Sequence, residues 1–272
     1  MDRKLDAFKT KKSLGQHFLN NTRVPELMAN AGNVVEGDTV LEIGPGTGVL
    51  TQELLKRGAR VIAFEADVRA IHSLENTFKD EITSQKLTLI HGDVREIDLY
   101  ALGLRPSAFK IIANIPYYLS GMLFRIFLES DIQPSTLVFL VQREVAERIA
   151  RDKKESLLSL SIKVFGNPRY VKTIGKGNFT PLPKIDSAII AITDISKKHL
   201  KATGITQTQF FSILHQGFKS RRKQLLGNLS ETLDRESLTH IFSTLELPLD
   251  VRGEDLTLSQ WLNLCQKISI HK

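Results

Sequence analysis

The chain has 272 residues, of which 42% are hydrophobic and 25% are charged, with a net charge of +7 and one cysteine, Cys265. A single cysteine excludes an internal disulfide and a metal site built from several cysteines, and it suits a reducing, cytoplasmic location. No stretch approaches the roughly 18 apolar residues of a membrane span, so we expect no membrane partner. The basic charge favours a polyanionic partner, and nucleic acid is the commonest one.

From residue 39 onward, short apolar runs alternate with stretches of helical periodicity. The predicted strands span residues 39–44, 60–66, 86–93, 110–116 and 135–142, and the predicted helices span residues 48–58, 67–78, 121–130 and 143–152. Near-continuous apolar strands separated by helices indicate a parallel sheet that is covered on both faces. Because crossovers between parallel strands are right-handed, the sequence predicts an α/β fold with a doubly wound, Rossmann-like sheet.

The pattern changes beyond residue 165. Residues 169–175 and 185–194 read as two further strands, which we expect to form an antiparallel edge of the sheet. After them, amphipathic stretches predict helices at residues 206–218, 221–229, 235–245 and 258–268. We therefore predict a catalytic domain at residues 1–197, which carries the sheet, and a smaller all-α C-terminal domain at residues 198–272.

The loop after the first predicted strand contains Gly44, Gly46 and Gly48 and leads into a helix. Such a loop lets a ligand approach the backbone and the N–H groups at the helix start, although a purely structural turn is the alternative. Its G-x-G-x-G spacing differs from the G-x-G-x-x-G fingerprint of dinucleotide-binding proteins. Glu65 and Asp93 end the next two strands at the same edge, where they can accept hydrogen bonds from ribose hydroxyls and an adenine amino group. This set fits a nucleoside ligand.

The fourth predicted strand ends at that edge in Asn114, Ile115, Pro116 and Tyr117. If the ligand is S-adenosylmethionine, this stretch predicts a clamp for a planar base that bears an amino group. The side-chain oxygen of Asn114 and the backbone carbonyl of Ile115 can accept the two N–H bonds, while Pro116 restricts the backbone. Tyr117 offers a flat face on which the base can stack. The alternative is a strand-terminal turn with tyrosines in a core.

Basic residues cluster in the predicted all-α domain. The candidates for RNA binding are Lys219, Arg221, Arg222 and Lys223. Contacts of such residues with phosphates make affinity steeply dependent on salt, although a charge run can also be a solvated helix face. A second group, which we expect to act as a basic arm, comprises Arg3, Lys4, Lys9, Lys11 and Lys12.

The motifs LGQHFL, EIGPGTGVLT, FEAD, GDV, NIPYYLS, QREVAERI and FTPLPKIDSA occur in this order along the chain. They resemble the motifs of ribosomal RNA adenine dimethyltransferases. With the later FKSRRKQLLGNL and RGEDLTLSQW, the chain is similar to the small-subunit (16S) members of KsgA type from residue 13 to about residue 264. The resemblance implies S-adenosylmethionine-dependent N6,N6-dimethylation of two adjacent adenosines near the 3′ end of 16S ribosomal RNA, and a role in subunit biogenesis. We expect a monomer that needs no metal and binds the small subunit or its precursor.

The resemblance also implies roles for individual residues. The expected cofactor contacts are His17, Leu19, Gly44, Gly46, Glu65, Asp93 and Asn114. The expected catalytic set is Asn114, Ile115, Pro116, Tyr117 and Phe179, in which the two aromatic rings sandwich the target base. Many family members carry Asn in place of His17. Tyr118 stands where some relatives carry Asn, so it receives no role.

Three alternatives use the same residues differently. A methyltransferase of large-subunit RNA, of the macrolide-resistance type, would share the catalytic motifs, but the extended helical tail favours the small-subunit enzyme. A dinucleotide-dependent oxidoreductase is disfavoured by the glycine spacing and by the NIPY stretch. A non-catalytic RNA-binding assembly factor is disfavoured because the residues expected to bind cofactor and target base are intact.

Overall fold

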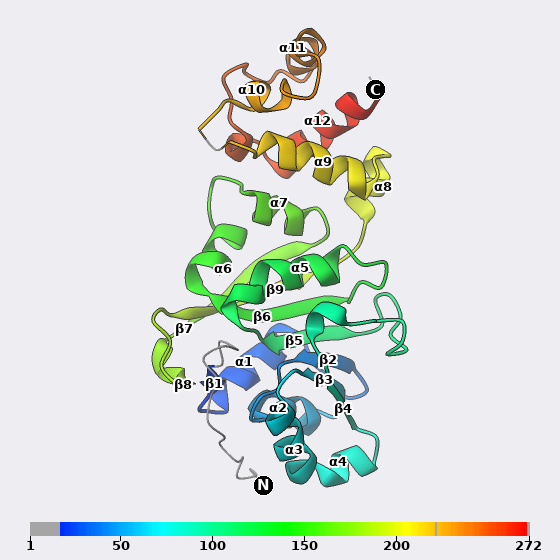
Figure 1. Cartoon of the computed structure of the whole chain (residues 1–272), viewed down its shortest axis with the longest axis vertical. Helices are drawn as coiled ribbons and strands as arrows, with labels where there is room; N and C mark the ends of the chain where they lie inside the picture. Colours follow the sequence, from blue (N-terminus) through cyan, green and yellow to red (C-terminus); the bar gives the residue numbers. More distant parts are fainter. Residues whose placement is uncertain (1–16, 221, 271–272) are drawn as a thin grey trace. The chain divides into compact units, whose positions relative to one another are not determined.

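The computed structural model describes residues 17–220 and 222–270 of the chain. Within this part, a seven-stranded sheet has the order β4-β3-β2-β5-β6-β9-β7 (Figure 1). Its strands are β2 (Thr39–Ile43), β3 (Arg60–Glu65), β4 (Leu87–His91), β5 (Lys110–Asn114), β6 (Thr136–Gln142), β7 (Asn167–Ile174) and β9 (Ser187–Thr193). Strands β4, β3, β2, β5 and β6 pair in parallel, and β9 pairs antiparallel with β6. The predicted Rossmann-like sheet with an antiparallel addition is confirmed.

Along the chain, helices alternate with the parallel strands. They are α1 (Arg23–Ala31), α2 (Val49–Lys56), α3 (Val68–Thr77), α4 (Lys79–Thr83), α5 (Ser120–Leu128) and α6 (Arg143–Ala150), with 3-10 turns η2 (Val94–Glu96) and η3 (Tyr117–Leu119). Helix α1 was not among the predicted elements, and it buries Val24 and Met28 against the sheet's hydrophobic core. Strand β5 ends at Asn114, two residues earlier than predicted, because Pro116 has no N–H to continue a ladder.

The central strands are buried along their length. Ile111, Ile112 and Ala113 of β5 are all fully buried, as are the five residues 137–141 of β6. A sheet covered on both faces buries consecutive residues, which explains the unbroken apolar runs in the sequence. Because the strands are parallel, polar residues at their carboxyl ends reach the same edge of the sheet.

A second, two-stranded sheet joins segments that lie far apart in the sequence. Strand β1 (Phe18–Leu19) pairs antiparallel with β8 (Phe179–Thr180), so that Phe18 lies opposite Thr180 and Leu19 opposite Phe179. The Nδ1–H of the His17 ring donates a 2.8 Å hydrogen bond to the Pro181 carbonyl, because a carbonyl oxygen can only accept. This pairing places the start of the described chain beside the carboxyl end of β5.

The chain divides into two compact units. Among the described residues, the first comprises 17–146 and 168–195, and the second comprises 147–167 and 196–270. The second unit begins within two residues of the predicted boundary at 197/198, but it also includes residues 147–167, which the sequence assigned to the first domain. The catalytic and RNA-binding roles of the two predicted domains stay predictions.

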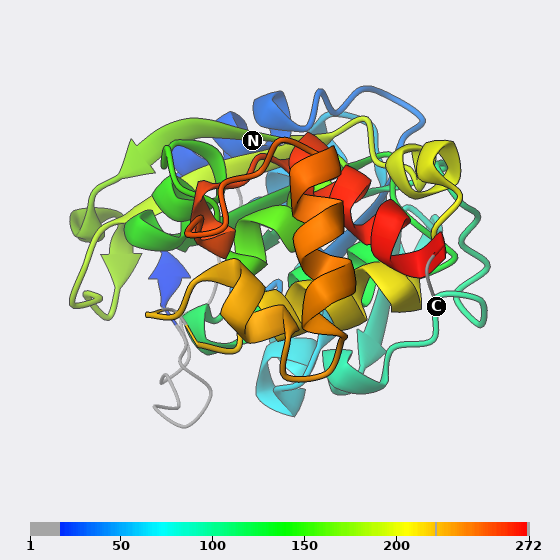
Figure 2. The same cartoon turned by 90° about the horizontal axis from the view of Figure 1, so that it is seen from above.

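The second unit is built from helices around buried aromatic rings. Its helices are α7 (Leu157–Lys163), α8 (Lys198–Thr203), α9 (Gln207–Gly217), α10 (Leu225–Leu229), α11 (Arg235–Thr244) and α12 (Leu258–Ile270), with the 3-10 turn η5 (Gly253–Asp255). Figure 2 shows α11 in orange beside α12 in red, and these two helices pack together. Phe210, Phe242 and Trp261 are fully buried in this unit. None of the described helices combines the length and the apolar character that crossing a membrane requires.

Candidate active site

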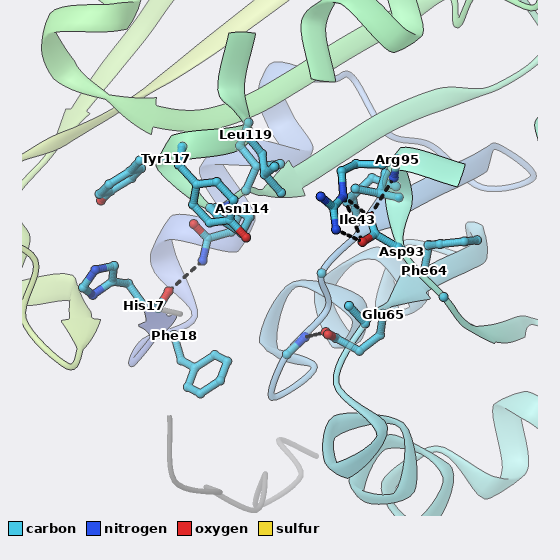
Figure 3. A pocket seen from close by; sticks show the side chains of 18 residues that line it. His17, Phe18, Ile43, Phe64, Glu65, Asp93, Arg95, Asn114, Tyr117 and Leu119 are labelled. Atoms are coloured by element: carbon cyan, nitrogen blue, oxygen red, sulfur yellow. Dashed lines mark hydrogen bonds and ion pairs between the residues drawn. The ribbon is translucent and has the colours of Figure 1, made fainter. Parts of the chain in front are cut away.

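A cavity of about 180 Å³ lies at the carboxyl ends of the parallel strands (Figure 3). Its lining comes from the segment at β1, the glycine loop after β2, the end of β3, the turn after β4 and the stretch after β5. The predicted site residues that line it are His17, Gly44, Gly46, Glu65, Asp93, Asn114, Ile115, Pro116 and Tyr117. Five segments that are separate in sequence therefore meet around one space.

The glycine loop has a backbone that other residues rarely adopt. Gly44 and Gly46 have φ values of +66° and +57°, in the left-handed region. A Cβ at Gly46 would lie 2.8 Å from Cε1 of Phe18, which also lines the cavity. Glycine is thus required both for the turn and for the approach of the β1 segment.

Glu65 stabilises this loop from the end of β3. Its Oε2 accepts a 3.1 Å hydrogen bond from the Gly46 N–H, and its Oε1 accepts one of 2.8 Å from the Asp67 N–H. Burial raises the pKa of the Glu65 carboxyl. The two carboxylate oxygens together have about four acceptor sites, so Glu65 keeps some acceptor capacity for the ribose.

Glu42 lies in β2, two residues before Gly44, and is one of the few ionisable residues that are buried. It is 1% exposed and accepts a 2.7 Å hydrogen bond from Oγ1 of Thr51 in the first turn of α2. Burial raises the pKa of Glu42 to about 8. The pair ties the end of β2 to the start of α2, so it fixes both sides of the glycine loop.

Asp93 is already engaged by a neighbour that the sequence reading did not single out. The guanidinium of Arg95 donates to both carboxylate oxygens, with Nε 2.9 Å from each, and the Arg95 backbone N–H donates to Oδ1 at 2.9 Å. These bonds from Arg95 lower the pKa of Asp93 to about 2. An adenine amino group can reach Asp93 only by sharing or displacing some of these bonds. An arginine two residues after a strand-terminal aspartate is the sequence signal for such a pair.

The amide of Asn114 faces the cavity in a defined orientation. Its Nδ2–H donates to the backbone carbonyl of His17 at 3.0 Å (Figure 3). Since a carbonyl can only accept, this bond assigns the nitrogen to the His17 side. The Oδ1 of Asn114 is then the acceptor that remains for a ligand, as the clamp hypothesis requires.

Tyr117 lies next to this amide in η3. Its hydroxyl forms a 2.6 Å hydrogen bond with Oγ of Ser187, and partial burial raises the pKa of the phenol. The ring stacks with the His17 imidazole, with centroids 5.8 Å apart and planes at 23°. The hydroxyl is therefore used to hold the ring in place.

Two of the predicted site residues do not line the cavity. Phe179 is 3% exposed and Leu19 is 7% exposed, and both belong to the hydrophobic core. Their roles in stacking and in covering the cofactor stay predictions. By contrast, Tyr118 lines the cavity and is 65% exposed, although the sequence reading gave it no role.

The predicted RNA-binding residues lie in the helical unit. Lys219 and Lys223 both form ion pairs with Glu231, while Arg222 is exposed. These pairs lower the pKa of Glu231. Arg221 and the basic residues at 3, 4, 9, 11 and 12 lie outside the described residues. Among the described residues, no group of three or more His, Cys, Asp or Glu side chains could hold a metal ion.

A Rossmann-like sheet with a nucleoside-type site at its edge is an arrangement found in methyltransferases. Two solved structures share the fold. A dimethyladenosine transferase from Plasmodium falciparum is 24% identical with a TM-score of 0.74, covering 91% of this chain and 96% of that chain. The 23S rRNA methyltransferase ErmE is 22% identical with a TM-score of 0.68, covering 93% of this chain and 99% of that chain.

The chain belongs to the ribosomal RNA adenine dimethylase family, which it matches over residues 7–269. It is similar to proteins named ribosomal RNA small subunit methyltransferase A. The one from Dehalococcoides mccartyi is 36% identical over 262 residues, which cover 95% of this chain and 88% of the relative. The one from Clostridium botulinum is 32% identical over 258 residues, covering 93% and 92%. The chain is therefore an S-adenosylmethionine-dependent rRNA adenine dimethyltransferase, and the resemblance read from its motifs is confirmed.

The residues present fit S-adenosylmethionine. The backbone at Gly44 and Gly46 is free of side chains that would fill the cavity, and Glu65 keeps acceptor capacity for the ribose. Asp93 supplies the acceptor for an adenine amino group once Arg95 gives up part of its contact. These assignments of single residues to the cofactor are predictions that the donor and acceptor chemistry supports.

Proposed function

We propose that this chain dimethylates N6 of two adjacent adenosines near the 3′ end of 16S ribosomal RNA, within the small subunit or its precursor. We further propose that it does so as a monomer in the cytoplasm and contributes to subunit biogenesis. The names of the relatives from Dehalococcoides mccartyi and Clostridium botulinum support the small subunit as the site of action. The observation that carries the chemistry is the Asn114 amide, which the His17 carbonyl orients with its acceptor oxygen available to a ligand.

The clamp acts on a weak nucleophile. The N6 lone pair of adenine is delocalised into the ring, so the amine must become pyramidal before it attacks. Oδ1 of Asn114 and the Ile115 carbonyl accept its two N–H bonds, which localises the lone pair on nitrogen. S-adenosylmethionine supplies an electrophilic methyl group on a sulfonium centre when it is bound.

Charge and protons balance without a metal or a strong base. Formation of the N–C bond would break the S–C bond of the cofactor, so the positive charge would pass from sulfur to nitrogen. The acceptor oxygens and the Tyr117 ring stabilise this charge. The methylated amine is acidic and loses its proton to water. Positioning by Asn114 and Tyr117 supplies most of the acceleration.

A second methylation needs a different use of the same clamp. N6-methyladenine has one N–H left, so one acceptor suffices and the first methyl group must rotate aside. Ile115 is 2% exposed, whereas Tyr118 at the cavity is 65% exposed. The open side of the cavity at Tyr118 is therefore where we place that methyl group.

The test is methylation of ribosomal subunits from cells that lack the modification. Purified full-length protein is incubated with labelled S-adenosylmethionine and either the small or the large subunit, and modified adenines are located by mass spectrometry. We expect N6,N6-dimethyladenosine at two adjacent positions in 16S RNA. Labelling of the large subunit would favour the macrolide-resistance type instead, and no labelling of either would favour an assembly factor. The Asn114→Ala variant is the control for contaminating activity.

A further inference from the structure

The helical unit contains a second cavity, of about 280 Å³, that the proposed chemistry does not use. One side of its wall is the segment between α6 and α7. The other side is formed by the end of α9 and the loop after it, by Asn228 of α10, and by Arg252 together with the turn η5. A single water needs roughly 10–15 Å³. The cavity therefore has room for a ligand of several atoms.

One buried ring fixes three parts of this wall. Trp261 is fully buried, and its Nε1–H donates to the Gly253 carbonyl at 3.0 Å. A Cβ at Gly217 would lie 2.4 Å from Cη2 of Trp261, so glycine is required for this contact. Phe218 stacks on Trp261 with ring centroids 5.5 Å apart and planes at 21°. Phe218, which is partly exposed, thus gives the cavity an aromatic surface of fixed position.

A buried acceptor in this wall has no partner. Asn228 is 1% exposed, and its Nδ2 donates to the carbonyls of Gly217 at 2.7 Å and Ser220 at 3.0 Å. Two carbonyl acceptors assign the amide nitrogen, so the other atom is the oxygen. That Oδ1 is buried and has no hydrogen-bond partner among the described residues. Buried polar atoms are nearly always paired, so this one indicates a missing N–H or O–H donor.

The charges around the cavity favour a phosphate near its rim. Four basic and three acidic side chains line it. Two of the acids are paired, since Glu254 binds Lys154 at 2.6 Å and Glu155 binds Lys163 at 2.6 Å. Two of the bases are paired as well, Lys154 with Glu254 and Lys223 with Glu231, so the phosphate contact is assigned to Arg252. Arg252 is exposed beside them, and a planar guanidinium can bind phosphate with two parallel N–H donors.

We propose that this cavity binds one unstacked nucleotide of the RNA substrate, other than the adenosine that is methylated. Its base stacks on Phe218 and its phosphate binds Arg252, and a small shift of the cavity wall on binding exposes Oδ1 of Asn228 to an N–H of the base. A stacked base cannot offer both its face and its edge, so the site selects single-stranded or extruded nucleotides. The inference rests on the proposed function for the identity of the RNA.

The sequence provides a local probe, because Trp261 is the only tryptophan in the chain. The full-length protein is titrated separately with AMP, GMP, CMP, UMP and inorganic phosphate while tryptophan fluorescence is recorded. Free N-acetyltryptophanamide corrects for absorbance. We expect a saturable change with at least one nucleotide and a much weaker response to phosphate. An equal response to phosphate, or no response to any nucleotide, would overturn the proposal.

Three variants locate the signal. Asn114→Ala, in the first unit, should titrate as the wild type does if the signal arises at Phe218 and not at the target pocket. Arg252→Gln, at an exposed position, should weaken nucleotide binding without changing the melting temperature. Phe218→Leu should weaken it by roughly 5- to 150-fold, the range for loss of one stacked base. Titrations that all three variants leave unchanged would place the binding elsewhere.

The ribosomal substrate separates this site from the proposed function. With small subunits, Arg252→Gln and Phe218→Leu should raise KM and leave kcat unchanged, and with a short RNA that carries only the target adenosines neither should differ from wild type. A loss of kcat on both substrates would show structural damage and contradict a binding role. If the wild type methylates no RNA at all, the proposed function fails, but the fluorescence titration still decides whether the cavity binds nucleotides.

Discussion

The side-chain amide of Asn114 is oriented by the backbone carbonyl of His17, at 3.0 Å. The residue at the end of β5 and the residue before β1 are separated by nearly a hundred positions in sequence, and the β1–β8 pairing brings them together. The acceptor oxygen expected to hold the target amine therefore depends on the placement of the N-terminal strand. The first prediction concerns this amide directly.

Asn114→Ala should lower kcat by about 10²- to 10³-fold, as expected for loss of one preorganised group that acts on the transition state. The affinity for S-adenosylhomocysteine, measured by calorimetry, should change by only a few-fold. The reason is that Oδ1 of Asn114 accepts a hydrogen bond from the amine of the target base, whereas Glu65 and Asp93 contribute most of the hydrogen bonds to the cofactor. Equal losses in kcat and in cofactor affinity would contradict the clamp.

Tyr117→Phe should keep most of the activity, and Tyr117→Ala should lose it, because the ring and not the hydroxyl faces the base. Loss of stacking costs about 1–3 kcal/mol. The Phe variant leaves the buried Ser187 hydroxyl without its 2.6 Å partner, which should lower the free energy of unfolding by about 1 kcal/mol. Steady-state kinetics and denaturant unfolding measure the two effects. An inactive but folded Phe variant would assign a chemical role to the hydroxyl.

Glu42 should make the protein less stable as pH rises. Burial raises its pKa in the folded protein to about 8 from the ordinary 4.5, so the folded state holds a proton that the unfolded chain releases between these values. Stability is therefore lost as pH increases from about 4.5 to 8. Glu42→Gln stays neutral and still accepts from Thr51, so it should raise the melting temperature at pH 8 and have little effect at pH 5. A variant equally affected at both pH values would show that Glu42 does not titrate in this range.

Arg95→Gln should tighten cofactor binding by a few-fold. Arg95 donates to both oxygens of Asp93, and an adenine amino group must compete with these bonds. Asp93→Ala, the matched control, should weaken binding because it removes the acceptor itself. Calorimetry with S-adenosylhomocysteine measures both variants. If Arg95→Gln weakens binding as much as Asp93→Ala does, then Arg95 positions Asp93 and does not compete with the ligand.

Substitution of Arg221 and Arg222 together by Gln should weaken RNA binding and reduce the slope of log affinity against log salt by about 2, one unit per lost phosphate contact. Glu231→Gln should have the opposite effect on affinity, because it releases Lys219 and Lys223 from their ion pairs. Filter binding to small subunits across a salt series tests both. An unchanged slope in the double variant removes these arginines from the interface.

Much of the site follows from the strand pattern. Glu65, Asp93 and Asn114 could be placed at one edge because carboxyl ends of parallel strands share an edge whatever the loops do. The contacts among them could not be predicted in the same way. The Asp93–Arg95 pair depends on rotamers at an exposed turn, and the burial of Phe179 depends on its register opposite Leu19 in β1.

The features that could not be predicted from the sequence are of two kinds. Some strands are very short, and one segment packs with a different compact unit from the one expected. Strands of two residues, such as β1 and β8, carry no periodicity from which they could be recognised. Residues 147–167 read as a continuation of the α/β alternation, yet they pack with the helical unit. Membership of a compact unit is decided by tertiary contacts, which local patterns do not encode.

The two-residue ladder between β1 and β8 also has a practical consequence for anyone who handles this enzyme. A purification tag fused upstream, or trimming by a protease near residue 17, would act on the segment just before β1, where the His17 carbonyl orients Asn114. Such a preparation would turn over slowly even though Asn114 itself is unchanged. If a tagged sample has a low kcat, the tag should therefore be removed before the low kcat is attributed to a substituted side chain.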